Sequence, residues 1–452
     1  MEQFDTVIVG AGLSGLTAAD ILARTGQRVC VIEARERVGG RSWTVQASNG
    51  LAVDIGGQWV GPTQQRVLGL IQRLGLQTYP QFTYGYKYQQ INGRRRRYRG
   101  TIPALPAFAL ADMQLRIWQL DAAARKLPED APWAAKEAGT WDQLSVAEWL
   151  QEKVWSRDAR SLIRIATHAV FAAEPERISM LQFLSYLRSA GGLMPLLETR
   201  GGAQDSRIAG GAQQLSERLA DQFVASGGEL RLGEPVSVID QDAERALIAT
   251  PDREVSAQQV IVAMSPADQA RIDFGEGSSS SRRQLCHEMP MGSVIKCIAL
   301  YERPFWRDQG NSGEYIGDEE PLRMSFDGSP PDRRCGALVG FILGKSVARW
   351  SRAGFKARRE AVCAQLADIF GADAAQPIDY IDQDWSSEEW TGGCYVGLFG
   401  PGRMQRHAVH LRQPEGRLHW AGTETARRWN GYLDGAIEAG ERAATEVLGT
   451  VR

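Results

Sequence analysis

The first forty residues of the chain contain a strand, a glycine-rich turn, a helix and a second strand in close succession. The β-branched run Thr6–Val9 is typical of a buried parallel strand. The turn Gly10-Ala11-Gly12-Leu13-Ser14-Gly15 follows, and apolar residues then recur at helical spacing from Leu16 to Ala23. A second apolar run, Val29–Ile32, ends on Glu33. This order predicts a parallel α/β unit whose helix begins directly at the glycine turn.

The three glycines and the acid each have a physical role in such a unit. Gly10 permits the tight turn, Gly12 lets the backbone approach a pyrophosphate, and Gly15 lets the helix pack closely on the strand. The start of the helix offers free N–H groups and about half a positive charge to phosphates. Glu33 is expected to accept hydrogen bonds from an adenosine ribose, a charged contact of about 1.5–3 kcal/mol. Because an acid favours a free 2′-hydroxyl, the pattern predicts NAD or FAD rather than NADP.

Length and composition exclude several other classes of protein. A chain of 452 residues suggests two or three domains, and its net charge of −2 gives no electrostatic reason to bind nucleic acid or an anionic membrane. The six cysteines lack metal-ligand spacing, so we expect no metal site, no disulfide framework and a cytoplasmic location. No stretch reaches the ~18 apolar residues of a membrane span, so we expect no transmembrane helix and no membrane partner.

The middle of the chain alternates between sheet and helix patterns. Residues 84–98 predict a hairpin turning at Asn92-Gly93, and the pattern from 105 to 190 is helical, with Ser145 and Ser179 as helix caps. The remaining predicted elements are helices over 63–74, 213–225 and 357–370, strands near 229–232, 236–239, 260–263 and 294–300, and a surface loop over 275–281.

Two further motifs lie near the carboxyl terminus. A glycine turn, Thr391-Gly392-Gly393, delivers Cys394 and Tyr395 side by side. The strand Arg417–Trp420 runs into Ala421-Gly422-Thr423-Glu424, and Tyr432-Leu433-Asp434 opens the last helix. This helix start, like the first one, presents N–H groups to a ligand, so we predict that both converge on one cofactor.

Several stretches occur in the order in which a known family carries them. They are Glu33–Arg41, Val53–Gly57 with the overlapping Asp54–Trp59, Val60–Gln64, Gly292–Cys297, Gly392–Tyr395 and Ala421–Thr425. On these motifs the chain resembles the flavin-containing monoamine oxidases along nearly its whole length. The mitochondrial members end in a membrane-anchoring helix, which we do not expect here, so the chain looks like a soluble, bacterial-type relative. A homodimer is one assembly open to it.

The resemblance implies an α/β fold with two domains. A Rossmann-like FAD-binding domain would be assembled from three segments, residues 1–80, 207–290 and 386–452. An α+β substrate domain with a mixed sheet would comprise residues 81–206 and 291–385. No transmembrane helix belongs to this expected fold.

The resemblance also implies roles for individual residues. Cys394 falls where the family's cysteine bonds to a flavin ring methyl, Lys296 where a lysine holds a water, and Tyr395 and Tyr432 where two tyrosines face each other; the last three are the catalytic candidates. The candidate substrate pocket comprises Trp59, His168, Gln204 and Met324, although His168 taken alone reads as a satisfied core histidine. The candidate FAD-binding residues are Gly10, Gly12, Gly15, Glu33, Arg35, Gly40, Arg41, Gly57, Gln58, Trp59, Val236, Trp385, Cys394, Gly422, Thr423, Glu424 and Tyr432.

The implied reaction is the FAD-dependent oxidation of a primary amine by dioxygen to aldehyde, ammonia and hydrogen peroxide. Two aromatic faces desolvate and aim a neutral amine, and a lysine fixes a water near the flavin. Three alternatives stay open: an L-amino-acid oxidase, which needs a pocket arginine for the carboxylate; a putrescine or polyamine oxidase; and a flavin protein without oxidase turnover, or a dehydrogenase.

The expected substrate is an apolar, aromatic monoamine. A second ammonium buried without a counter-ion would cost several kcal/mol, and Met324 at the expected pocket position is apolar. Glu319 and Glu320 are the residues that could overturn this expectation, if either faced the pocket.

Overall fold

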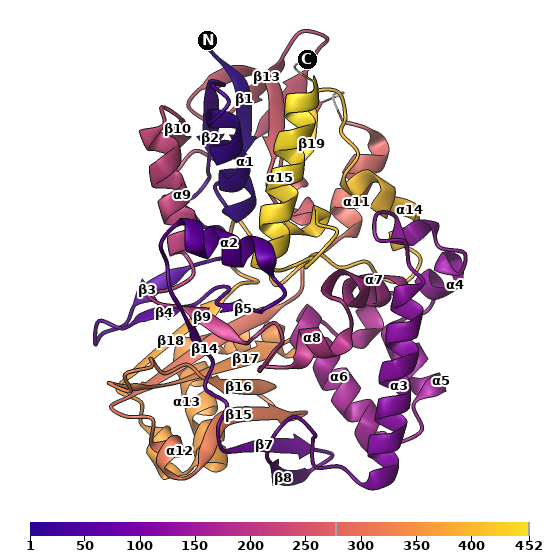
Figure 1. Cartoon of the computed structure of the whole chain (residues 1–452), viewed down its shortest axis with the longest axis vertical. Coiled ribbons are helices and arrows are strands. Elements are labelled where there is room, and N and C mark those ends of the chain that lie inside the picture. Colours follow the sequence, from indigo (N-terminus) through magenta and orange to yellow (C-terminus); the bar gives the residue numbers. More distant parts are fainter. Residues whose placement is uncertain (276–277, 451–452) are drawn as a thin grey trace.

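The computed structural model describes residues 1–275 and 278–450. A sheet with its covering helices forms one end of the elongated molecule, and a second sheet beside a group of helices forms the other (Figure 1). The amino and carboxyl termini both lie at the end that contains the first sheet (Figure 1).

The first sheet places the predicted glycine turn at the end of its central strand. Its strand order is β10-β2-β1-β13-β12-β11, with β19 also paired to β13. The parallel strands are β10 (Glu229–Arg231), β2 (Val29–Ile32), β1 (Glu2–Val9), β13 (Glu254–Val262) and β19 (Leu418–Trp420). The antiparallel strands are β12 (Ala246–Ala249) and β11 (Val238–Gln241). The strands come from three separate parts of the chain, whereas the domain boundaries at 80, 207, 290 and 386 stay a prediction.

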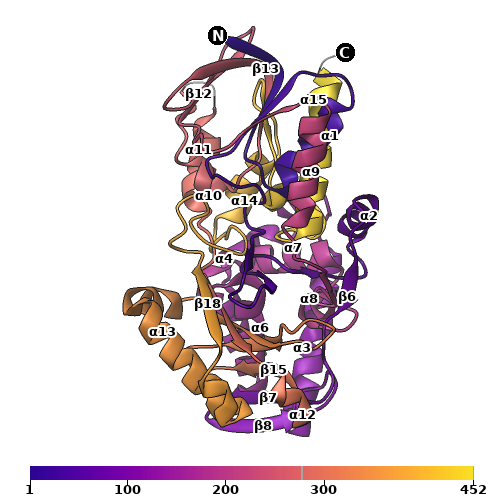
Figure 2. The same ribbon diagram turned by 90° about the vertical axis from the view of Figure 1, so that its left-hand side faces the viewer.

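Three helices cover one face of this sheet (Figure 2). They are α1 (Leu13–Ala23), α9 (Gln214–Ala225) and α15 (Leu433–Thr450). Ile8 and Val31 face them, while the alternate residues Val7 and Val9 belong to the cluster on the opposite face. Because both faces are buried, the strands read as continuous apolar runs.

The second sheet is mixed and forms one wall of the site described below. Its order is β18-β14-β17-β16-β15-β7-β8, antiparallel except for the pair β15 and β7. The strands are β18 (Asp379–Asp384), β14 (Val294–Tyr301), β17 (Gly336–Leu343), β16 (Met324–Asp327), β15 (Asn311–Gly317), β7 (Tyr86–Ile91) and β8 (Arg94–Tyr98). Helices α12 (Phe305–Asp308) and α13 (Ser346–Phe370) contribute to its core.

A group of helices and several short elements complete the fold. The helices are α3 (Ala107–Arg125), α4 (Ala138–Gln143), α5 (Val146–Lys153), α6 (Arg157–Phe171), α7 (Met180–Ala190) and α8 (Leu193–Leu197). Short sheets pair β3 (Thr44–Gln46) with β4 (Ala52–Asp54), and β5 (Trp59–Val60) and β6 (Thr78–Pro80) with β9 (Ser206–Ile208). Four further helices are α2 (Gln65–Arg73), α10 (Pro266–Gln269), α11 (Ser280–Glu288) and α14 (Met404–His407).

Local signals in the sequence are confirmed where they depend on neighbouring residues. Asn92 and Gly93 have φ angles of 51° and 71°, as a type I′ turn requires. Ser145 and Glu148 form the predicted capping box, and the Ser179 hydroxyl accepts a hydrogen bond from the Gln182 backbone N–H. None of the helices in the described ranges is both long and apolar enough to cross a membrane.

Several predicted boundaries are wrong, because they depend on how strands pair and on a non-helical residue inside a helix. β13 begins at Glu254 rather than 260, since its first half pairs with antiparallel β12. β11 covers 238–241 rather than 236–239 for the same reason. The helix predicted over 357–370 begins at Ser346, and the non-helical Gly354 (φ 80°) divides it. In the expected loop 275–281, residues 276–277 lie outside the described residues, and α11 already begins at Ser280.

Candidate active site

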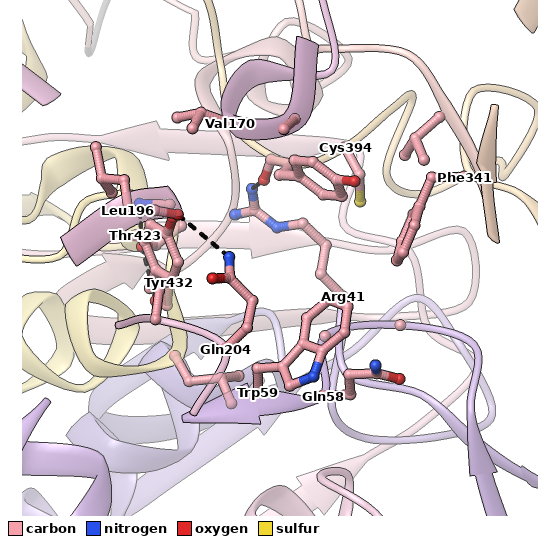
Figure 3. A pocket seen from close by; sticks show the side chains of 18 of the residues that line it. Arg41, Gln58, Trp59, Val170, Leu196, Gln204, Phe341, Cys394, Thr423 and Tyr432 are labelled. Carbon is pink, nitrogen blue, oxygen red and sulfur yellow. Dashed lines mark hydrogen bonds between the residues drawn. The ribbon is translucent and has the colours of Figure 1, made fainter. Parts of the chain in front are cut away.

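A cavity of about 900 Å³ lies where the first sheet, the second sheet and the helices meet. The glycine turn after β1 lines it, as do Lys296 on β14 and Tyr432 just before α15. Trp59, Gln204, Phe341, Cys394 and Tyr432 converge on the same space (Figure 3). The cavity therefore brings together the dinucleotide motif and all three catalytic candidates.

The glycine turn has the geometry that its sequence predicts. Gly10 has a φ of 105°, and a Cβ at Gly15 would lie only 2.0 Å from the Gly10 carbonyl oxygen, so helix α1 packs closely on β1. Gly12 lines the cavity. A Cβ atom added to Gly12 would have no heavy atom of the described residues within 4 Å, apart from those of its neighbours in the sequence. The backbone at Gly12 thus leaves open room for a phosphate at the start of α1.

Glu33 and two arginines surround this turn. Oε2 of Glu33 accepts a hydrogen bond from the Ala11 N–H (2.8 Å), and Arg35 bridges Glu33 and Glu388. Arg41 pairs with Glu424 through both carboxylate oxygens and donates to the Tyr395 carbonyl oxygen (2.9 Å). Burial opposes the charged form of Arg41, but the Glu424 carboxylate outweighs it and raises the pKa of the guanidinium. Arg41 thus stays charged at the cavity wall.

The residues present fit a flavin dinucleotide. Besides the open turn at Gly12, the buried amide of Gln58 has an Nε2 donor to which no other described residue offers an acceptor, so it needs a partner. Two of the predicted set, Gly15 and Glu424, stand behind the cavity wall and act on it through Gly10 and Arg41. The predicted cofactor residues that line the cavity are Gly10, Gly12, Glu33, Arg35, Gly40, Arg41, Gly57, Gln58, Trp59, Val236, Trp385, Cys394, Gly422, Thr423 and Tyr432.

Cys394 and the two tyrosines border the cavity close together. Cys394 and Tyr395 are joined by a cis peptide bond, and Tyr395 stands edge-on to Phe341 at 6.5 Å between ring centroids. Tyr432 stands edge-on to Trp429 at 5.0 Å. Burial raises the pKa of the Cys394 thiol to about 12, although the charge of Arg41 opposes the shift. Burial likewise raises the pKa of both tyrosines, so their hydroxyls stay protonated.

Lys296 is a buried lysine, and no carboxylate among the described residues contacts it. Its Nζ atom donates to the Gly56 carbonyl oxygen (2.9 Å) and to Oε1 of Gln58 (2.7 Å). Burial lowers the pKa of the amine to about 7, which the more distant Asp54 carboxylate partly opposes. Besides its bond to carbon, Nζ has three tetrahedral positions. The two hydrogen bonds take two of them, so the third is left for a small ligand such as water.

The four predicted pocket residues do not all reach the cavity. Trp59, Gln204 and Met324 line it, and Trp59 is fixed by a hydrogen bond from its Nε1 to Gln81 (2.9 Å). His168 does not line it: Nε2 pairs with Glu174 at 3.0 Å inside the helical region. Placing His168 in the pocket was wrong, because that end of α6 turns the ring towards the segment that follows. Among the described residues, no cluster of His, Cys, Asp and Glu is arranged to hold a metal ion.

Other lining residues were not found from the sequence. Phe341 lies opposite Lys296 across β14 and β17, and Met324 lies opposite Phe341 across β17 and β16. The three residues thus form a row across the sheet, which is apparent only from how the strands pair and not from the sequence. The lining residues that were missed include Lys87, Tyr98, Tyr186, Leu196, Glu198, Asp268, Glu314, Ile316, Phe326 and Phe341.

Comparisons with known proteins find a family model and relatives that match nearly the whole chain. The model of a family described as flavin containing amine oxidoreductase matches residues 13–448. The chain is similar to flavin-containing amine oxidase B of Sus scrofa (38% identity over 453 residues, 99% of this chain and 86% of the relative). Amine oxidase A of Equus caballus is similar too (37% identity, covering 99% and 85%).

Solved structures show the same likeness. One is a putrescine oxidase variant from a structure-based redesign of cofactor binding (TM-score 0.95, 32% identity, 99% of both chains). Another is cyclohexylamine oxidase from Brevibacterium oxydans IH-35A (TM-score 0.93, 33% identity, 99% of both chains). The fold class and the family resemblance predicted from the sequence motifs are thereby confirmed.

Proposed function

The chain belongs to the flavin-containing amine oxidoreductase family, and on this premise we propose that it oxidises primary monoamines with an apolar, aromatic body. It is an oxidoreductase that acts on amines, with FAD as the cofactor that the family implies. The proposed products are an aldehyde, ammonia and hydrogen peroxide, with dioxygen as oxidant and water hydrolysing the released imine. The observation that supports this most directly is that Lys296, Tyr395 and Tyr432 share one cavity with the glycine turn.

The protein residues around the cavity would hold FAD, which when bound supplies the hydride acceptor. The start of α1 and Arg41 are suited to the phosphates, and Glu33 to the ribose. We further propose a thioether from Cys394 to a flavin ring methyl. A redesigned putrescine oxidase carries an alanine-to-cysteine change, which supports a role for a cysteine in cofactor binding in such folds.

Tyr395 and Tyr432 would position the amine. Both line the cavity and both hydroxyls stay protonated, so the rings present uncharged aromatic faces. Such faces favour the lone pair and the developing positive charge of the amine while they exclude water. Lys296 would hold a water or dioxygen at its free position, since Gly56 and Gln58 take the other two.

The cavity wall beyond these residues favours an apolar substrate body. Met324, Phe326 and Ile316 line it on the second sheet, and Val170 and Leu196 line it on the helices. Glu319 and Glu320 are exposed and do not line the cavity. An uncompensated ammonium among the apolar residues would cost several kcal/mol, which disfavours short diamines.

The arrangement also disfavours an L-amino-acid oxidase. Arg35, Arg41 and Arg271 are the lining arginines among the described residues. Arg35 and Arg41 are engaged by carboxylates, and Arg271 stacks over Trp390 at 5.8 Å, all on the cofactor side. None is placed beside Met324 to pair with a substrate carboxylate.

The test is peroxide release in air from the purified holoenzyme. We expect kcat/KM to be highest for phenylethylamine or tyramine, and at least a hundredfold lower for putrescine and L-amino acids. That ratio corresponds to roughly 3 kcal/mol. Reduction of the flavin by amines without peroxide would indicate a dehydrogenase instead, and preference for an L-amino acid would refute the assignment.

A pair of variants tests the pocket position directly. Met324→Glu should raise the relative kcat/KM for putrescine, because it supplies the missing counter-ion. Met324→Gln adds polarity without charge and is the control. An equal response of the two variants would show that charge at this position does not select the substrate.

A further inference from the structure

The cavity has a polar end that the amine chemistry does not use. Lys87 on β7, Tyr98 on β8, Glu198 after α8 and Glu314 on β15 all line it. These side chains come from four separate segments and face a cavity whose wall on this side is mostly apolar, with Thr101, Gln114 and Thr199 as further polar lining residues. The surrounding lining residues are Ile102, Leu110, Met113, Ile117, Leu162, Ile165, Leu197 and Ile316.

Glu314 has hydrogen-bonding capacity left over. It is 7% exposed, and its Oε2 lies 2.8 Å from Nζ of Lys87. Its Oε1 atom is buried and has no hydrogen-bond partner within the described ranges. Burial raises the pKa of the carboxyl, although Lys87 opposes the shift. Nearby, neither amide atom of the fully buried Gln89 has a hydrogen-bond partner in the part of the chain that the structure describes. Buried polar atoms without partners are rare and indicate a missing polar ligand or water.

Glu198 adds a second carboxylate. Its side chain is half-buried, and it makes no hydrogen bond or ion pair with the parts of the chain that the structure describes. Burial raises its pKa, with the charge of Lys87 opposing the shift. Two carboxylates against one ammonium leave this end of the cavity with a net negative charge when both are ionised. One additional positive charge would balance it.

The strand register shows how far this end lies from the catalytic lysine. A row of paired residues crosses the sheet from Lys296 through Phe341, Met324 and Ile316 to Gln89. Between β14 and β15 the row crosses three strand spacings of about 4.8 Å each, so these two strands lie roughly 14 Å apart. Glu314 precedes Ile316 by two residues on β15 and also lines the cavity, so it lies about 7 Å along the strand from the end of this row.

The row starts at Lys296, which lines the catalytic end of the cavity with Tyr395 and Tyr432, and its length is of the same order as that of an extended ten-carbon diamine. An alkyl chain advances about 1.25 Å per bond, given C–C bonds of ~1.52 Å at ~111°. The eleven bonds between the nitrogens of 1,10-diaminodecane therefore span roughly 14 Å. Putrescine, with five bonds, spans only about 6 Å and would leave its second ammonium among the apolar residues.

We propose that Glu198 and Glu314 form an outer subsite for a second ammonium group, so that the enzyme accepts long α,ω-diamines while it rejects short ones. The inference rests on the proposed amine oxidase function and refines its substrate class. Lys87 holds Glu314 in place, and Glu198 supplies the unpaired carboxylate. The apolar section between the subsite and the tyrosines accommodates the methylene chain.

The test compares matched amines that differ only in the far group. In the parent, kcat/KM for 1,10-diaminodecane should exceed that for decylamine by about tenfold, mainly through KM, whereas putrescine should not exceed butylamine. In Glu198→Gln the ratio of diaminodecane to decylamine should fall towards one. Glu319→Gln, an exposed change in the loop between β15 and β16 that does not line the cavity, should leave the ratio unchanged.

The outcomes separate this inference from the function on which it rests. Decylamine turnover without any advantage for diaminodecane, or an advantage that survives Glu198→Gln, would overturn the subsite and leave the amine oxidase function standing. Absence of peroxide from every amine would overturn both. Glu198→Gln removes no hydrogen bond or ion pair within the described residues, so loss of the ratio would not reflect unfolding.

Discussion

Nη2 of Arg41 lies 2.9 Å from Oε2 of Glu424, although 383 positions separate the two residues in the chain. The Glu424 side chain is completely buried, and that of Arg41 is one-quarter exposed at the cavity. Arg41 also donates to the Tyr395 carbonyl oxygen. The pair therefore connects the turn at Gly39-Gly40, just before Arg41, with both carboxyl-terminal motifs of the cofactor site.

Glu424→Gln should destabilise the protein strongly, because it leaves the Arg41 charge without its partner. Breaking a buried ion pair in this way costs about 3–5 kcal/mol. Urea unfolding of the holoenzyme measures the loss. Glu152→Gln, which breaks the exposed pair with Lys153, should change the free energy of unfolding by less than about 1 kcal/mol. Similar losses in the two variants would show that Arg41 has found another partner.

Cys394→Ala should release the flavin on acid precipitation, whereas the parent should keep its yellow colour in the pellet. The reason is that the proposed thioether survives denaturation and non-covalent contacts do not. Cys297→Ala, which alters a buried thiol that does not line the cavity, is the control and should behave like the parent. Yellow colour in the supernatant of the parent would rule out the covalent bond but not FAD binding.

Lys296→Met should slow reoxidation of the flavin by dioxygen more than reduction by amine. Methionine fills the same space but cannot hold a water or small oxidant at the free Nζ position. Stopped-flow traces of the two half-reactions measure this separately. Replacing Tyr395 and Tyr432 together by leucine should instead slow reduction by amine more than reoxidation by dioxygen, since the rings position the amine. If Lys296→Met reoxidises at the parent rate, the lysine serves the structure only.

The unfolding free energy of the parent, relative to Lys296→Met, should rise between about pH 7 and pH 10. The folded pKa of Lys296 is lowered to about 7, so in this range the unfolded chain binds a proton that the folded chain does not. The slope should be at most about 1.4 kcal/mol per pH unit. Below about pH 7 both states are protonated and the difference should level off.

Denaturant unfolding of both proteins across this pH range checks the expected rise. Lys126→Met, which alters an exposed lysine, is the control and should show no comparable slope. A flat difference between the parent and Lys296→Met would mean that the lysine keeps its proton in the fold.

The sequence alone determined the features that depend on near neighbours. The glycine turn at Gly10, the Asn92-Gly93 turn and the Ser145 cap follow from allowed φ angles and from hydrogen bonds within four residues. The family motifs also led to Lys296, Cys394, Tyr395 and Tyr432, which the structure gathers in one cavity. The predictions of the turns and the cap succeeded because short-range sterics specified each of them, whereas the roles of the four motif residues stay predictions.

Only the tertiary structure decided which distant side chains meet. His168 turns to Glu174 and away from the cavity, while Lys87 and Glu314, more than two hundred residues apart, form an ion pair at its outer end. The register of β14, β17, β16, β15 and β7 sets the row that separates this pair from Lys296. A shift of one residue in any strand would turn its side chains to the opposite face. The periodicity of a single strand cannot specify its register against strands far away in sequence, so the packing of the whole sheet decides it.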